Sequence, residues 1–127
     1  FFGYHREQLG DLPIVIANEA KTLLDSLTLP KYAGVMGEVI KALRTALQDR
    51  EVDQKELIEY AIRMDSTSII ARLGFLLEWL GYSSDGLPLV RNPVSLDPQR
   101  KRGGRYIPKW KLSINLPLEE VFVDGVG

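Results

Sequence analysis

The sequence predicts an α+β fold that is mostly helical, with about four helices after a short N-terminal strand and short C-terminal strands forming a small sheet. Three observations predict this class. A β-branched run lies near the start. Apolar residues then recur at steps of three and four through residues 19–80, as on the buried face of a helix. Three prolines interrupt the segment that follows. With 127 residues the chain has the length of one domain, and we expect residues 1–127 to form a single one.

The first expected element is a strand at Leu12–Ala17, because its β-branched run is typical of a buried strand. Asn18 follows as a candidate N-cap, since an asparagine side chain can accept a hydrogen bond from the first backbone amides of a helix. The helix after it is expected to end before Pro30. Its inward face carries Leu23, Leu24 and Leu27.

Two more helices are expected in the middle of the chain. The first follows a loop that contains Gly34, and it shows the clearest amphipathic pattern. Asp53 and Glu56 resemble a capping box at the start of the second. The residues expected to face inward on these helices are Met36, Val39, Ile40, Leu43 and Leu47, then Leu57, Ile58, Ala61, Ile62 and Met64.

The fourth expected helix is the most apolar. It begins among the possible caps at residues 65–68 and runs to Leu80, with Gly81 as the left-handed residue that ends it. Apolar residues, including Ile70, Leu73 and Leu76, cover more than half of its circumference, so we expect neighbours on several sides. Gly74 costs about 1 kcal/mol relative to alanine inside a helix, and we expect it to permit the close approach of another helix.

Short strands are expected after the fourth helix, because the prolines there argue against a long helix. Residue types favour strands at residues 87–90 and 110–116, and one more short strand is expected within residues 117–127. The late strands are candidates to pair with the early strand. Along residues 110–116, alternation predicts that Trp110 is buried, while Tyr106 is expected to be partly exposed.

The composition excludes several classes of function. The chain has no cysteine and a single histidine, His5, so disulfides, thiolate catalysis, most metal sites and histidine-based triads lack their residues. Carboxylate neighbours such as Glu119 and Glu120 have no base or metal-binding residue at a useful spacing. We therefore expect no catalytic residue, no metal and no cofactor. Apolar stretches fall short of the about 20 residues of a membrane span, no signal peptide is visible, and we expect a cytoplasmic protein.

Arg72 raises the first functional question, because it lies inside the apolar fourth helix beside Phe75 and Trp79 on the helical wheel. Its stem could pack on apolar surface while the guanidinium reaches solvent or caps the carbonyls of a neighbouring helix. It could form a buried pair with a carboxylate such as Asp25 or Glu38. Alternatively, Arg72, Phe75 and Trp79 could form a face that binds a partner.

The charge is unevenly distributed. The chain has a net charge of -1, yet residues 91–111 contain seven basic residues and one acidic residue, giving +6 against -7 for the rest. One interpretation is a solvated loop whose charges protect an edge strand from aggregation. The other is an electrostatic platform for phosphates or an acidic protein, with Tyr106 and Trp110 able to stack on unpaired bases. We call these basic residues the basic strip: Arg91, Arg100, Lys101, Arg102, Arg105, Lys109 and Lys111.

Five segments in order carry a resemblance to a known family: IVIANEAKTLLDSL, LPKYAGVMGEVIKAL, VDQKELIEYAIRM, ARLGFLLEWLG and LDPQRKRGGRYIPKWKLSIN. They resemble the C-terminal domain of AbiEi-type (type IV toxin–antitoxin) antitoxins and related transcriptional regulators, over roughly residues 2–116. They include an R-L-G-Y-L-L-E type of segment, a Leu-Asp-Pro segment and a Trp-x-Leu-x-x-Asn strand, and the resemblance rests on the order of all five. The chain departs from the family pattern at Gly34, which Val35 follows in place of a second glycine.

The resemblance implies a two-part protein. A winged helix-turn-helix at the N-terminus binds operator DNA, and the C-terminal domain neutralises a nucleotidyltransferase-like toxin or serves regulation where no toxin is present. This chain matches the second part, so we expect the N-terminal DNA-binding domain to be absent from it. The alternative is a nucleic-acid-binding domain that uses residues 100–111 directly. The sequence does not indicate an oligomeric state, an operator or a small effector.

Overall fold

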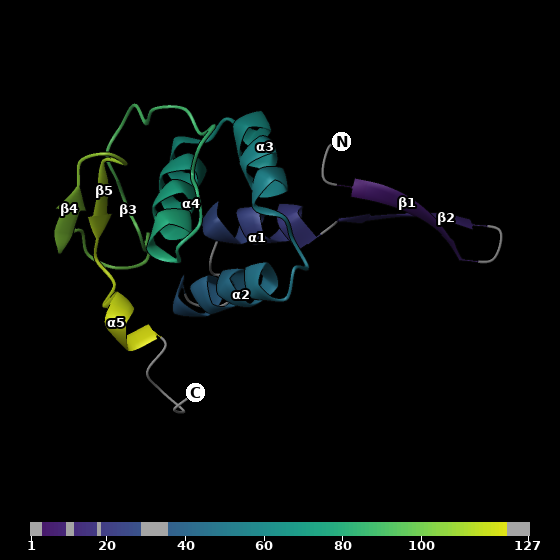
Figure 1. The fold of residues 1–127 in the computed structure, drawn as a ribbon, viewed down its shortest axis with the longest axis horizontal. Coiled ribbons are helices and arrows are strands. Elements are labelled where there is room, and N and C mark those ends of the chain that lie inside the picture. The colour runs from purple at the N-terminus through teal and green to yellow at the C-terminus, as the bar shows by residue number, and fades with distance from the viewer. Residues whose placement is uncertain (1–3, 10–11, 18, 29–35, 122–127) are drawn as a thin grey trace.

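The computed structural model describes residues 4–9, 12–17, 19–28 and 36–121, and its helices and strands confirm the mostly helical α+β class. Four longer helices form the body, and a three-stranded sheet lies beside α4 (Figure 1). The elements are β1 Tyr4–Leu9, β2 Leu12–Ala17, α1 Glu19–Thr28, α2 Met36–Gln48, α3 Gln54–Met64, α4 Thr67–Trp79, β3 Val94–Ser95, β4 Arg105–Ile107, β5 Leu112–Ile114 and α5 Leu118–Val121.

The strand pairing differs from the expectation. The strand at Leu12–Ala17 is confirmed as β2, but it pairs with β1 in an antiparallel hairpin that places Tyr4 opposite Ala17. The hairpin extends away from the helices on the side opposite the small sheet (Figure 1). The late strands pair with one another in the order β3-β5-β4, with β3 parallel and β4 antiparallel to β5. β1 was not predicted, because YHREQL is mostly polar and has no β-branched residue.

One of the expected late strands is wrong, and the last one, expected within residues 117–127, lies partly outside the described residues. Residues 87–90 form no strand, and Leu89 is 89% exposed, so this segment has no alternating buried face. Residues 118–121 form the short helix α5 in place of a strand, directly after Pro117. Proline suits the start of a helix because its missing N–H would be unpaired there in any case. Leu118 and Val121 of α5 are buried, and α5 packs against α2.

α4 lies at the centre of the fold, in contact with α1, α3, β3 and β5 (Figure 1). Leu73, Leu76 and Leu77 are fully buried, which confirms a helix with neighbours on several sides. The expected inward faces of α1 and α2 are also buried. On α3 the prediction was wrong for Ile62, which is 44% exposed and so lies on the outer side of the helix. Leu80 and Met64 are half-buried.

The helix ends of α3 and α4 follow the sequence closely. Ser66 caps α4, with its Oγ accepting from the Ile69 backbone N–H at 3.4 Å. At the other end, the N–H of Gly81 donates to Glu78 O and that of Tyr82 to Leu77 O, the paired bonds of a Schellman motif. Asp53 is the N-cap of α3, but its side chain makes no capping hydrogen bond, so the expected capping box does not form. The predicted cap at 18 and loop at 34 lie outside the described residues.

Gly74 faces an aromatic ring and not a second helix. A Cβ at this position would overlap the six-membered ring of the Trp110 indole, so the glycine is what lets that ring lie against the α4 backbone. Trp110 is 3% exposed, which confirms its predicted burial. The contact attaches the turn between β4 and β5 to the centre of the helical body.

Candidate functional site

Arg72 is a structural residue at the junction of α1, α4 and the small sheet. Its Nη1 donates to the Leu27 carbonyl at 2.6 Å and its Nε to the Ser95 carbonyl at 3.0 Å, and the residue is 5% exposed. Leu27 lies in the last turn of α1, so the guanidinium caps a neighbouring helix, as one of the three interpretations holds. Burial lowers the pKa of Arg72, and the charge of Asp97 opposes that shift.

The carboxylates proposed as partners of Arg72 pair elsewhere. Asp25 accepts from Lys21 Nζ at 2.9 Å, and Glu38 Oε1 lies 3.6 Å from Lys41 Nζ. The acidic residue that acts electrostatically on Arg72 is Asp97, which is 4% exposed. Arg72 is therefore too buried to contact a partner. The predicted partner-binding face of Arg72, Phe75 and Trp79 does not include Arg72.

Glu78 joins the end of α4 to the turn that follows it and to the distant residues Lys109 and Trp110. Its carboxylate accepts hydrogen bonds from Ser84 Oγ at 2.6 Å, from Trp110 Nε1 at 3.0 Å and from Lys109 Nζ. Partial burial would raise the pKa of Glu78, but these three hydrogen bonds and the Lys109 charge outweigh it, so the pKa lies below its usual value. Lys109 and Trp110 therefore take part in contacts within the fold. The ring of Trp110 is buried and cannot stack on a base.

The remaining members of the basic strip divide into two groups. Lys111 is half-buried and donates to the Arg91 carbonyl at 3.2 Å. The others are exposed, and within the described part of the chain their side chains make no ion pair or hydrogen bond. These exposed members are Arg91, Arg100, Lys101, Arg102 and Arg105.

Asn115 holds the backbone of the loop that carries the exposed basic residues. Its Nδ2 donates to the carbonyls of Asp97, Arg100 and Lys101 at 2.8, 3.3 and 3.1 Å. Its Oδ1 accepts from the Asp97 N–H at 2.8 Å, and Asp97 Oδ1 in turn accepts from the Gln99 N–H at 2.9 Å. Asn115 and Asp97 were not among the predicted site residues. The signal was present, since both lie in the Leu-Asp-Pro and Trp-x-Leu-x-x-Asn motifs.

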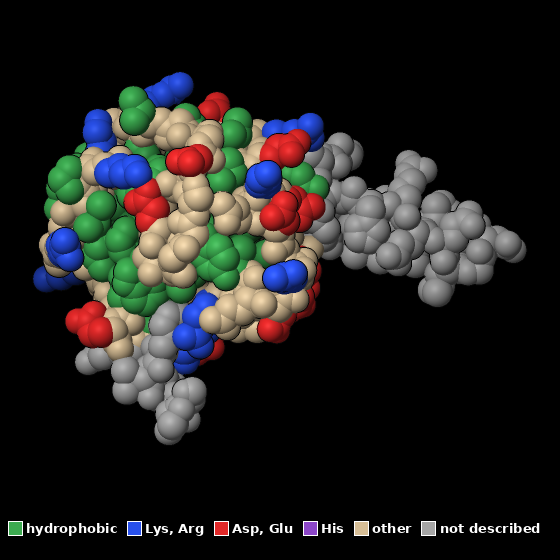
Figure 2. Space-filling model, viewed as in Figure 1, with side chains coloured by type: hydrophobic (Ala, Val, Ile, Leu, Met, Phe, Trp, Pro, Cys, Tyr) green, Lys and Arg blue, Asp and Glu red, His purple; other side chains and the backbone are tan. Residues whose placement is uncertain are grey.

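A groove of about 540 Å³ brings the two candidate sets together. α4 contributes Phe75 and Trp79, the basic strip contributes Lys101 and Arg105, and residues 114–119 complete the lining. Phe75 is half-buried and Trp79 is 38% exposed. Figure 2 shows hydrophobic side chains reaching the surface over the small sheet and toward α5, with Lys and Arg side chains along the margin beside β4. The fold therefore combines apolar surface and positive charge in one place.

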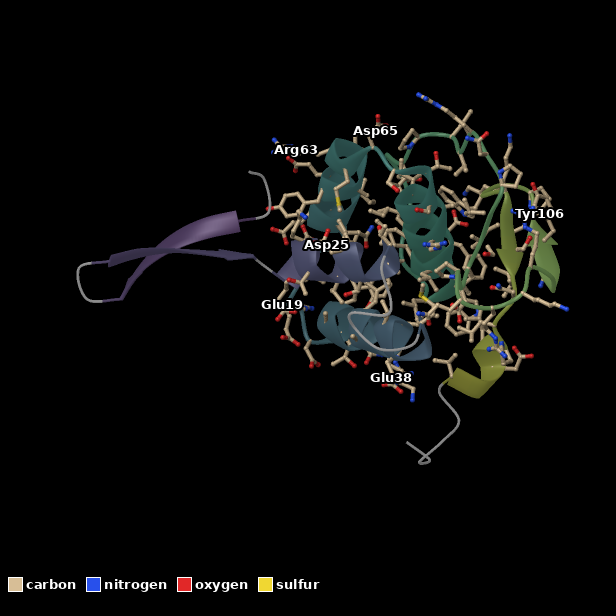
Figure 3. All side chains as sticks on the ribbon, turned by 180° about the vertical axis from the view of Figure 1, so that it is seen from behind. Glu19, Asp25, Glu38, Arg63, Asp65 and Tyr106 are labelled. Atoms are coloured by element: carbon tan, nitrogen blue, oxygen red, sulfur yellow. The ribbon has the colours of Figure 1, made fainter. Side chains whose placement is uncertain are left out.

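Tyr106 lies outside this groove. Successive side chains of a strand point to opposite faces, so Arg105 and Ile107 share the groove face of β4 and Tyr106 occupies the other. Tyr106 is 48% exposed, which confirms the predicted partial exposure. Figure 3 shows it at the sheet end of the molecule, with Glu19 and Asp25 on α1 toward the opposite end.

Comparison of the chain with protein-family models, curated proteins and solved structures gives no match. Among the described side chains, no three His, Asp or Glu groups lie close enough together to share a metal ion. None of the described helices has the length and apolar character needed to cross a bilayer.

Proposed function

We propose that this chain is a non-catalytic interaction domain that acts in the cytoplasm as the C-terminal domain of an AbiEi-like transcriptional regulator and antitoxin. Its mechanism is stoichiometric binding of a nucleotidyltransferase-like toxin, or support of DNA-bound regulation where no toxin is encoded. The observation that carries the proposal is the groove, which joins Phe75 and Trp79 to unpaired basic side chains. Apolar area and charge are what a binding surface uses.

The internal polar contacts support a role in binding. Arg72 and Glu78, which would be the most suggestive charged residues of α4, both hold the fold together through hydrogen bonds. Asn115 holds the backbone at Arg100 and Lys101, while the side chains of these two residues are left for contact with other molecules. A rigid body with a pre-formed charged surface binds with little loss of conformational entropy.

The motif residues on which the resemblance rests contact one another within the fold. The Asn115 side chain accepts a hydrogen bond from the backbone N–H of Asp97, in the Leu-Asp-Pro segment, and donates one to its backbone carbonyl. The Gly of ARLGFLLE, Gly74, faces the Trp of the closing strand, Trp110. The resembling segments thus contact one another at the residues that make them recognisable.

The test is co-purification with a nucleotidyltransferase-like protein encoded next to the gene of this chain. We expect the two proteins to elute together from a size-exclusion column and the growth arrest caused by the toxin to be relieved. If both proteins are folded and elute separately, and growth is not restored, the antitoxin function is wrong.

A second function, direct binding of nucleic acid, is favoured by the exposed residues Arg100, Lys101, Arg102 and Arg105, which have no described partner. Phosphate contacts release counterions, so the affinity for an oligonucleotide should fall steeply as salt rises. Charge reversal of Arg102 and Arg105 should abolish binding in a fluorescence polarisation assay. Failure to bind single or double strands at low salt would exclude this function.

A further inference from the structure

We propose that the groove binds an acidic segment of a partner protein, which inserts one apolar side chain between α4 and β5 and places carboxylates against Lys101 and Arg105. This inference rests on the proposed interaction function, because it assigns the part of the domain that meets the partner. Four observations carry it: the apolar floor, the position of the charges, the rigidity of the basic loop and the place of the aromatic rings.

The floor of the groove is apolar. Phe75 and Trp79 from α4 and Ile107 and Ile114 from the sheet line it, and Leu118 of α5 closes it. Its volume of about 540 Å³ lies within the range of roughly 300–1,000 Å³ that accommodates bound organic groups. Covering apolar surface with another apolar group removes it from water, so the floor favours an aliphatic or aromatic side chain.

The charges at the rim are asymmetric. Lys101 and Arg105 come from β4 and the loop before it, where Arg100 and Arg102 are also exposed, whereas Glu119 comes from α5. A carboxylate near Arg105 can accept two parallel hydrogen bonds from the guanidinium, whereas one near Glu119 would be repelled. The occupant therefore has its acidic groups toward β4 and not toward α5.

The basic loop is ordered before anything binds. Asn115, itself part of the groove wall, donates to the carbonyls of Arg100 and Lys101 at 3.3 and 3.1 Å. Gly104 has a φ of +77°, and any Cβ there would overlap the Ile114 carbonyl, so the loop joins β4 by a close backbone contact. Binding does not have to order this loop, which favours recognition of a short segment.

The aromatic rings favour a protein occupant over a nucleic acid. Bases stack on rings that present a free face, and a binding strip needs several in a row. Tyr106 lies on the opposite face of β4, and Trp110 is buried against Gly74 with its Nε1 bonded to Glu78. Glu119 would also repel phosphates. The groove therefore suits an apolar side chain flanked by carboxylates.

The experiment uses a short fluorescein-labelled peptide with one Phe flanked by Glu residues, measured by fluorescence polarisation at low salt. We expect binding to the wild-type chain and a Kd about tenfold weaker for the double variant K101E/R105E, because two attractions become repulsions. Replacement of Phe by Gly in the peptide should weaken binding by a similar factor. Glu119→Gln should strengthen it about twofold.

The matched control is K55E/R63E, which makes the same charge change on exposed positions of α3. We expect it to bind the peptide as the wild type does, and thermal unfolding of both double variants confirms that they are folded. Equal losses in the two double variants would overturn the proposal, since they would reflect overall charge alone. Equal binding of the Gly peptide, or a single-stranded oligonucleotide that binds more tightly and displaces the peptide, would also overturn it.

A separate measurement distinguishes the groove from the function. The nucleotidyltransferase-like partner is titrated against wild type and K101E/R105E. If the wild type forms the complex and the double variant forms it equally well, the groove assignment is wrong and the interaction function stands. If the wild type forms no complex, the proposed function is wrong, whatever the peptide does.

Discussion

Two arginines on either side of the small sheet have opposite environments. Arg72 is buried in α4 and donates to the carbonyls of Leu27 and Ser95, so its charge serves the fold. Arg105 is exposed on β4 at the rim of the groove, and its side chain has no partner among the described residues. The difference shows that burial and hydrogen bonding, and not residue type, separate a structural cation from one available for binding.

The largest effect is expected for Arg72→Ala. It leaves two buried carbonyls without a donor and removes the packed stem, and each unsatisfied group costs about 1–3 kcal/mol. We expect a loss of about 3 kcal/mol in the free energy of unfolding, measured by urea denaturation. Arg72→Lys should lose at least about 1 kcal/mol, because an ammonium cannot reproduce the two-pronged geometry of the guanidinium. A near-neutral Arg72→Ala would show that the bonds contribute little.

The second effect concerns the contact that holds the sheet to α4. Gly74→Ala places a methyl group where the Trp110 ring lies, and overpacking of this kind costs about 1–3 kcal/mol. The control is Gly37→Ala on α2, where the nearest atom to the new methyl is Val121 Cγ2 at 3.9 Å. That change should stabilise the protein by about 0.5–1 kcal/mol through helix propensity. Equal thermal stability of the two variants would contradict the close contact.

A smaller effect on stability is expected from the ionisation of Glu78, and this effect depends on pH. The pKa of Glu78 in the folded protein lies below the usual value of 4.5. The ionised carboxylate therefore stabilises the fold above pH 4.5, and this stabilisation is lost as the pH falls through the folded pKa. Its side chain is 34% exposed, so solvent screens the interaction with Lys109. The difference in Tm between wild type and Glu78→Gln should therefore be greatest near neutral pH and shrink in acid. A difference that is constant across this range would exclude the charge as its source.

The smallest effect on stability is expected for Arg105→Glu, the counterpart of Arg72→Ala. The residue is exposed and has no described partner, so the free energy of unfolding should change by no more than about 0.5 kcal/mol. Urea denaturation under the same conditions compares the two arginines directly. A loss as large as that of Arg72→Ala would remove the distinction between them.

The helical part of the fold could be predicted because its signals are local. The faces of α1 and α2 follow from apolar spacing, and the end of α4 follows from Gly81. The strands were harder, because β3, β4 and β5 are two or three residues long and form only when a distant partner supplies the hydrogen bonds. The short helix after Pro117 was missed for a related reason, since its apolar residues suit either element until packing decides.

The residues of the candidate site could be predicted from the sequence, but their meeting in one groove could not. The helical wheel placed Phe75 beside Trp79, and the charge count marked Lys101 and Arg105, yet no local signal brings these pairs to one groove. The sheet does so by packing against α4. The same limit explains Gly74, whose partner Trp110 is far along the chain. The antitoxin function stays a prediction that rests on the motifs.

The single amide of Asn115 has a consequence for how this surface can change. Asn115 hydrogen-bonds to backbone carbonyl oxygens of the loop, so these bonds do not depend on which side chains stand at positions 100 and 101. Mutation can exchange those side chains, including their sign, while the path of the chain stays the same. The binding specificity of this loop can therefore differ between related proteins at almost no cost to folding.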